Sequence, residues 1–138
     1  MLGAMIPIGQ ALESTGITAL IATEVVSLAG DLHIFWILMI ILIITMLITD
    51  VINNAATAVI MAPFSVNIAL QLGQPLEPFL MVVAVGASCA FLTPIGHQCN
   101  TLVMGPGNYK FSDYWRLGLP LDILIVLASI PMILFVWL

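Results

Sequence analysis

The stretch Asp50-Val51-Ile52-Asn53-Asn54-Ala55-Ala56-Thr57 sets a group of polar side chains inside an almost uninterrupted apolar sequence. An apolar run over residues 33–49 ends at it, and a second run, over residues 56–72, follows it. Another polar break, Thr93-Pro94-Ile95-Gly96-His97-Gln98-Cys99-Asn100, comes later in the chain. Irregular backbone at membrane depth is tolerated only where protein buries it or where it lines a water-filled cavity. Two such breaks predict a transport site built from interrupted helices.

The composition indicates a lipid environment. Hydrophobic residues make up 62% of the chain and charged residues 7%, whereas soluble domains carry about 25% charged residues. We therefore expect an all-α, polytopic membrane protein in the plasma membrane, or in the inner membrane of a bacterium. The net charge of −5, from seven acids and two bases, argues against a nucleic-acid partner.

The chain of 138 residues has room for about four membrane elements at roughly 20 residues each. That is small for a carrier, so we expect a part of a larger one. Polar residues divide this single membrane domain into a membrane helix with an interfacial extension (1–30), a re-entrant helical hairpin (31–74), an interrupted transmembrane helix (75–107), a cytoplasmic interfacial segment (108–117) and a final transmembrane helix (118–138).

The hairpin prediction rests on the two apolar arms around the Asn53-Asn54 tip. They are of similar length, and the first could reach roughly 26 Å as a helix, slightly less than a hydrocarbon core of about 30 Å. Two ordinary spans joined by a tight loop remain possible on length alone. Both basic residues, Lys110 and Arg116, fall in the short segment before the last apolar run. The positive-inside rule places that segment in the cytoplasm and both ends of the hairpin outside.

The adjacent amides of Asn53 and Asn54 offer donors and acceptors without net charge. At a hairpin tip, the N–H groups of the following helix start could add donors for an anion. The carbonyls that end the preceding helix would suit a cation. One break could thus hold an anion and a sodium ion side by side. The alternative is that the two asparagines only cap helix ends.

Asp50 is a candidate for ion coupling, because a carboxylate within a membrane is a functional candidate by default. It could help to hold a cation or accept a proton, or it could be a structural acid bonded to backbone amides. In the second break, Pro94 and Gly96 interrupt the helix. Oxygen atoms exposed there suit a hard cation such as sodium. The alternative for His97 is a hydrogen-bonded packing residue.

Three stretches carry a resemblance to a known family: Ala11-Leu12-Glu13-Ser14-Thr15-Gly16, residues 49–58 around the first break, and residues 87–100 around the second. They resemble the C-terminal portion of the divalent-anion/sodium symporters, which include sodium/sulfate and sodium/dicarboxylate carriers. The resemblance covers essentially the whole chain. It implies one half of an inverted-repeat, elevator-type carrier that is a homodimer when complete, with the first repeat missing here.

Site residues follow from the resemblance by position. The family's Ser-Asn-Thr motif falls on Asn53, Asn54 and Ala55, so only its asparagine is retained. The implied substrate-binding residues are Asn53, Asn54, Ala55, Thr57, His97 and Gln98, and the implied sodium-binding residues are Thr49, Ile52, Asn54 and Gly96. No cofactor is expected besides sodium as the coupling ion.

The departures from the family pattern bear on the substrate. Ala55 removes a hydroxyl that would touch an anion oxygen, and Gln98-Cys99 stands where dicarboxylate carriers commonly have proline. We therefore expect sodium-coupled symport of sulfate or a similar oxyanion, with dicarboxylate as the alternative.

Two other classes of protein compete with a carrier. A membrane assembly subunit without transport would explain the short length but not two polar breaks at matching depth. An intramembrane hydrolase would need a nucleophile and a base at a plausible spacing, which the sequence does not supply. We therefore expect no catalytic residues and no enzyme activity.

Overall fold

The computed structural model describes residues 33–137 and, in the part before them, Pro7, Ala11, Ser14, Thr15, Gly16, Leu20, Thr23 and Glu24. Residues 33–137 contain five α-helices and no strand: α3 (Ile34–Thr49), α4 (Asn54–Leu72), α5 (Leu76–Ser88), α6 (Gln98–Met104) and α7 (Phe111–Trp137). The all-helical prediction is confirmed over this range. The membrane helix predicted at 1–30 and the Leu-Glu-x-Thr-Gly segment lie largely outside the described residues.

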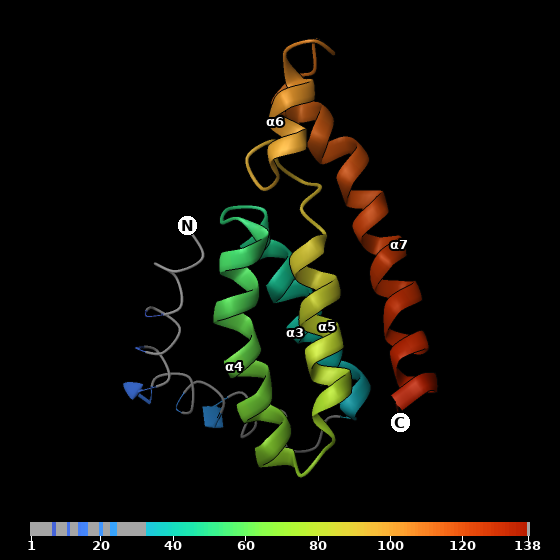
Figure 1. Cartoon of the computed structure of the whole chain (residues 1–138). Coiled ribbons are helices and arrows are strands. Elements are labelled where there is room, and N and C mark those ends of the chain that lie inside the picture. Colours follow the sequence, from blue (N-terminus) through green and yellow to red (C-terminus); the bar gives the residue numbers. More distant parts are fainter. Residues whose placement is uncertain are drawn as a thin grey trace.

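Helices α3 and α4 flank the first break as the sequence predicts (Figure 1). Residues 50–53 make the turn between them. At its far end α4 stops at Gly73, which takes the left-handed conformation with φ 63°. Glycine adopts this conformation without steric cost, and the two N–H groups that follow the helix close on its last carbonyls. The helices and turns are those of a hairpin, while its re-entrant placement in a bilayer stays a prediction.

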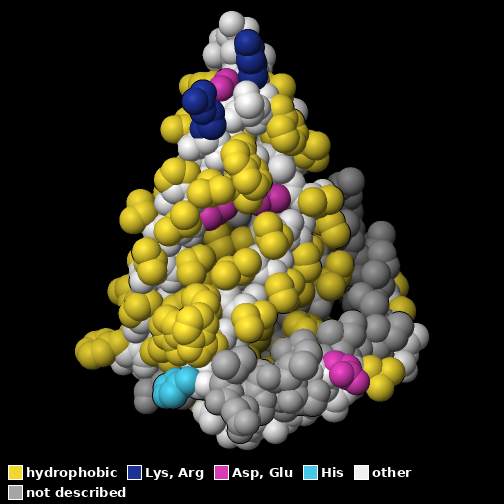
Figure 2. Space-filling view, turned by 180° about the vertical axis from the view of Figure 1, so that it is seen from behind, with side chains coloured by type: hydrophobic (Ala, Val, Ile, Leu, Met, Phe, Trp, Pro, Cys, Tyr) yellow, Lys and Arg dark blue, Asp and Glu magenta, His cyan; other side chains and the backbone are white. Residues whose placement is uncertain are grey.

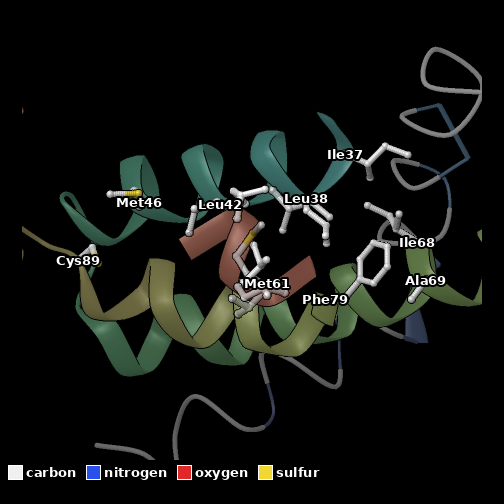
Figure 3. Packing of buried hydrophobic residues seen from close by; sticks show 14 residues of the cluster. Ile37, Leu38, Leu42, Met46, Met61, Ile68, Ala69, Phe79 and Cys89 are labelled. Atoms are coloured by element: carbon white, nitrogen blue, oxygen red, sulfur yellow. The ribbon is translucent and has the colours of Figure 1, made fainter. Parts of the chain in front are cut away.

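Helix α5 packs against both α3 and α4, so the hydrophobic core lies where the three helices meet. Figure 3 shows Leu38 and Leu42 of α3 opposite Met61 of α4, with Met46 near Cys89 at one end of the core and Phe79 near Ile68 at the other. The buried positions of α3 recur every three or four residues, as expected for one face of a helix.

A small residue brings α3 and α5 close together. A Cβ at Gly86 of α5 would lie 2.9 Å from Thr45 Cβ and 3.2 Å from Leu42 Cδ1 of α3. Glycine at such a position lets two helix backbones approach closely. Gly86 lies in a run of small residues, 84–90, and it is a point where α5 approaches α3 closely.

The second break separates α5 from α6, as predicted. Residues 89–97 are irregular, and the chain then resumes a short helix at Gln98. Asn100 stabilises this irregular segment, because its Nδ2 donates to the carbonyls of Ala90 at 2.8 Å and Thr93 at 3.2 Å.

The boundary predicted between 117 and 118 is not a helix boundary. Helix α7 runs without interruption from Phe111 to Trp137, with Gly118 and Pro120 inside it. Glycine and proline both disfavour helix interiors. Membrane helices nevertheless tolerate proline where other groups satisfy the freed backbone. The interfacial segment and the final span are therefore parts of one helix.

Two of the described helices, α4 and α7, are long and apolar enough to cross a membrane, while α3 and α5 are shorter apolar helices. Hydrophobic side chains cover most of the face shown in Figure 2, and the Lys and Arg side chains gather at one end of it. This distribution agrees with a multi-pass membrane protein whose basic end lies at the water interface.

Candidate functional site

The two polar breaks meet in the folded chain. The carbonyl of Asp50 accepts a hydrogen bond from Thr93 Oγ1, and the Gly96 N–H donates to the same hydroxyl oxygen at 3.1 Å. A Cβ at position 96 would lie 2.9 Å from the Thr49 carbonyl oxygen. The second break therefore lies directly against the first because Gly96 has no side chain.

Three oxygen atoms converge at this contact. Thr49 Oγ1 lies 2.9 Å from Asn54 Oδ1 and 3.0 Å from the Ala87 carbonyl oxygen. A hydroxyl has a single proton, so it can donate to only one of these acceptors at a time. Thr49 is fully buried, with 0% of its surface exposed. We call this group the Thr49–Asn54–Ala87 oxygen cluster, and its composition is that preferred by a hard cation.

The ends of two helices make the surroundings of this cluster electronegative. Helix α3 ends at Thr49 and α5 ends at Ser88, and Ala87 contributes its carbonyl to the cluster. The last carbonyls of a helix lack intrahelical partners and carry the negative end of its dipole. The two basic residues, Lys110 and Arg116, lie exposed at and before the start of α7. A cation would therefore be attracted to the cluster.

Of the implied sodium-binding residues, the structure brings Thr49, Asn54 and Gly96 together. Ile52, whose main-chain carbonyl is the implied ligand, lies in the turn after α3, and that role stays a prediction. Ile52 is 39% exposed, and its N–H donates to the carbonyl of Ile48 at 2.9 Å. Its side chain lines an apolar groove on the outer face of α3.

The two asparagines at the tip have different partners. Asn53 caps α4, because its Oδ1 accepts from the Ala56 N–H at 2.9 Å. Asn54 instead turns its Oδ1 to Thr49. Asn53 and Ala55 are exposed at the helix start, where an anion could approach. Thr57 is fully buried, and its hydroxyl donates to the Asn53 carbonyl at 3.2 Å. It therefore stabilises the backbone of the tip and is not exposed to a ligand.

His97 and Gln98 are exposed at the start of α6. His97 Nδ1 accepts from the Cys99 N–H at 3.2 Å, which makes it the cap of this helix. Because Gly96 touches the tip, the next residues along the chain lie at the edge of the same site. Their side chains remain candidates for contact with a substrate.

Asp50 is 4% exposed. One of its carboxylate oxygens, Oδ1, accepts from the Leu92 N–H at 3.0 Å. The structural role that the sequence left open, a bond to backbone amide, therefore accounts for half of this carboxylate. Its Oδ2 is buried and has no hydrogen-bond partner within the part of the chain that the structure describes.

Sequence reasoning missed several groups that build the site. They are the Ala87 carbonyl and two residues of α7 that hold the second break, Tyr114 and Gly118. Tyr114 donates its hydroxyl to the Asn100 carbonyl at 2.7 Å. A Cβ at Gly118 would lie 2.5 Å from the Phe91 carbonyl oxygen. Only the small side chain of Gly118 could have hinted at this contact from the sequence.

The chain is similar to transporters over most of its length. A protein of Synechocystis named as an uncharacterised transporter is 36% identical over 137 residues, which is 99% of this chain and 22% of the relative. The transporter YfbS of Escherichia coli is 40% identical over 129 residues, 94% of this chain and 21% of the relative. The chain thus spans about a fifth of the length of these relatives. None of these names denotes an enzyme.

A further relative carries a more specific name. Sodium/sulfate cotransporter 2 of Chlamydomonas reinhardtii is 28% identical over 123 residues, 88% of this chain and 14% of the relative. This agrees with the resemblance to divalent-anion/sodium symporters. The family model described as citrate transporter matches residues 1–138. This chain therefore belongs to the citrate transporter family of membrane proteins, related to the sodium/sulfate cotransporters.

Proposed function

We propose that this chain forms part of a sodium-coupled symporter for a divalent anion, with sulfate as the first substrate, in the plasma membrane. The observation that carries the proposal is the Thr49–Asn54–Ala87 oxygen cluster, which lies where the two interrupted segments meet. Buried oxygens at the C-terminal ends of α3 and α5 favour a monovalent cation. Transporters of interrupted-helix type place their ion and substrate sites at such points.

Asn54 links the two ligands in this proposal. Its Oδ1 faces Thr49, which leaves its NH₂ group free to donate to an anion at the exposed tip. The N-terminal end of α4 adds main-chain donors and the positive end of the helix dipole. Bound sodium would then supply the charge that compensates the anion, since neither basic residue of the chain lies at the tip. Cation and anion would thus stabilise each other's binding.

The substrate class rests on the tip and on the relatives. The tip offers neutral donors, and Ala55 lacks a hydroxyl, which suits a compact oxyanion held by amides. Relatives named as sodium/sulfate cotransporters support sulfate. The description of the family as citrate transporters favours a carboxylate as the second candidate. The proposed elevator motion, the first repeat and the homodimer would belong to the complete carrier.

The test is uptake by the complete protein in proteoliposomes. Labelled sulfate, succinate and citrate are offered in turn with an inward sodium gradient, and then with potassium in its place. We expect sulfate to accumulate only with sodium. Uptake of succinate or citrate, without uptake of sulfate, would show that the substrate is a carboxylate. Accumulation driven by a proton gradient without sodium would overturn sodium coupling and favour proton coupling through Asp50.

A further inference from the structure

A second acid, Asp122, has one buried carboxylate oxygen on the face of α7 that packs against the segment bound to Asp50. Asp122 is on α7, and its Oδ1 is buried and, like Asp50 Oδ2, has no hydrogen-bond partner among the described residues. An ionised carboxylate without a partner inside a protein carries a large free-energy penalty, and more so at membrane depth. Each such oxygen needs either a proton or a bound cation to offset this penalty.

The packing of α7 brings the two acids to the same place. Gly118 and Asp122 are four residues apart, so they lie on the same face of α7. Gly118 is in contact with the backbone of Phe91 and Leu92, because a Cβ there would lie 2.5 Å from the Phe91 carbonyl and 3.1 Å from the Leu92 nitrogen. Leu92 in turn donates its N–H to Asp50. Leu92 and Asp122 also line one groove between α3 and α7.

This location differs from the Thr49–Asn54–Ala87 oxygen cluster. Thr49 and Asp50 are consecutive at the end of α3, and successive side chains of a helix point about 100° apart. The hydroxyl of Thr49 accordingly turns to α5, whereas the carboxylate of Asp50 turns to Leu92. Helix α7 supplies no atom of the oxygen cluster.

We infer that Asp50 Oδ2 and Asp122 Oδ1 form a second site for a sodium ion, beside Leu92. Carboxylate oxygens are preferred ligands of hard cations. Asp50 is 4% exposed and already fixed by one backbone bond, so its free oxygen is held in place. Both basic residues of the chain lie exposed near the start of α7, so neither fills this role. The site shares with the proposed function only the identity of the ion.

The experiment is equilibrium binding of ²²Na⁺ to the complete purified protein without any anion, so that its result does not depend on transport. Asp122→Asn preserves the size of the side chain and removes its charge. We expect this variant to lose the ion held at this site, or to bind it at least roughly tenfold more weakly. Asp122→Glu, which restores the charge, should retain the ion. Glu77→Gln is the matched control, because Glu77 is exposed in the first turn of α5.

Thr49→Val separates the two sites. It should remove sodium from the oxygen cluster and leave the ion at Asp122 in place, so the double variant with Asp122→Asn should lose both. Unchanged binding in Asp122→Asn would overturn the inference, as would equal loss in Asp122→Asn and Asp122→Glu, which would indicate a structural effect. Uptake of a proton by the purified protein in place of the ²²Na⁺ ion would also overturn it. None of these three outcomes would change the expectation that Thr49→Val impairs sodium-driven uptake, so failure of this inference can be told apart from failure of the proposed function.

Discussion

Asn53 and Asn54 are chemically identical neighbours, yet the fold gives them separate tasks. The side-chain oxygen of Asn53 accepts the Ala56 N–H and so caps α4, whereas the side-chain oxygen of Asn54 accepts from the hydroxyl of the buried Thr49. Capping is a role that serine fills about as well as asparagine. The oxygen of a side chain in the cation cluster has no such simple substitute.

Because the oxygen of Asn54 is held by Thr49, its NH₂ group is the one proposed to donate to the anion, and this gives a prediction for substrate affinity. A charge-assisted hydrogen bond contributes about 1.5–3 kcal/mol, and about 1.4 kcal/mol corresponds to tenfold. Asn54→Ala should therefore weaken anion affinity by roughly ten- to a hundredfold, measured as the substrate concentration for half-maximal uptake. Asn53→Ser should be tolerated far better, because serine retains the cap. Normal affinity in Asn54→Ala would place the substrate elsewhere.

Thr49 and Thr45 provide a matched pair for sodium. Both are fully buried on the same face of α3, one turn apart. Thr49 Oγ1 belongs to the oxygen cluster, whereas Thr45 Oγ1 only donates back to the Ile41 carbonyl at 2.6 Å within its own helix. Valine has nearly the shape of threonine without the oxygen.

Thr49→Val should therefore raise the sodium concentration needed for uptake, by roughly tenfold or more for the loss of one ligand. Thr45→Val should leave the sodium dependence unchanged. Sodium titrations of uptake with both variants test this directly. An equal shift in the two would mean that packing of α3, and not a ligand, is responsible.

At the scale of helices, α7 holds the second break at two points. Tyr114 bonds the start of α6, and Gly118 contacts the backbone that leads out of α5. Both lie on one face of α7, four residues apart. The geometry of the irregular segment, and with it the position of Gly96, therefore depends on a helix that is distant in sequence.

Gly118→Ala tests this contact, because the contact decides whether the substitution stabilises or destabilises the protein. In an ordinary helix interior alanine is more favourable than glycine by about 1 kcal/mol. Here the added Cβ would meet main-chain atoms of Phe91, so we expect destabilisation of about 1–3 kcal/mol. The measurement is thermal unfolding of the complete protein. Gly105→Ala is the control, because a Cβ there meets nothing within 4 Å. A stabilised Gly118→Ala protein would show that the contact is absent.

Whether α3 and α4 form a re-entrant hairpin or two ordinary spans can be tested by labelling. If it is a re-entrant hairpin, single cysteines at His33 and Gln74 should both react with an impermeant reagent from outside. The background should carry Cys99→Ser, because Cys99 is exposed while Cys89 is buried. Reaction of the two positions from opposite sides would show two ordinary spans.

For the whole molecule, charge sets the orientation. The two basic residues lie at one end, and the positive-inside rule places that end in the cytoplasm. A cysteine at Gly105, an exposed position with open space around it, should react only from the cytoplasmic side. Labelling from outside would invert the topology, and it would also place the hairpin mouth in the cytoplasm.

Much of the architecture can be read from the sequence, because local chemistry decides it. Apolar runs of helical length, the asparagine cap, the left-handed Gly73 and the Pro94–Gly96 break all act within a few residues. The apolar helices and the two breaks lie where they were predicted, the asparagine cap was one of the two alternatives for the tip, and the conformation of Gly73 was not predicted. The last helix begins earlier than the predicted final span: α7 starts at Phe111 and continues through Gly118 and Pro120, and Gly118 packs against the second break.

The sequence by itself thus determined that the protein is a membrane protein, where its helices and two polar breaks lie, and to which family it belongs. Only the tertiary structure decided which atoms of those breaks meet. The bond of Thr49 to the Ala87 carbonyl, the contact of Gly96 with Thr49 and the contact of Gly118 with Phe91 join residues that are distant in the chain. The physical reason is that every residue has a main-chain carbonyl, so the sequence does not show which carbonyl becomes a ligand. A glycine permits a close contact, but the sequence does not show which residue it contacts.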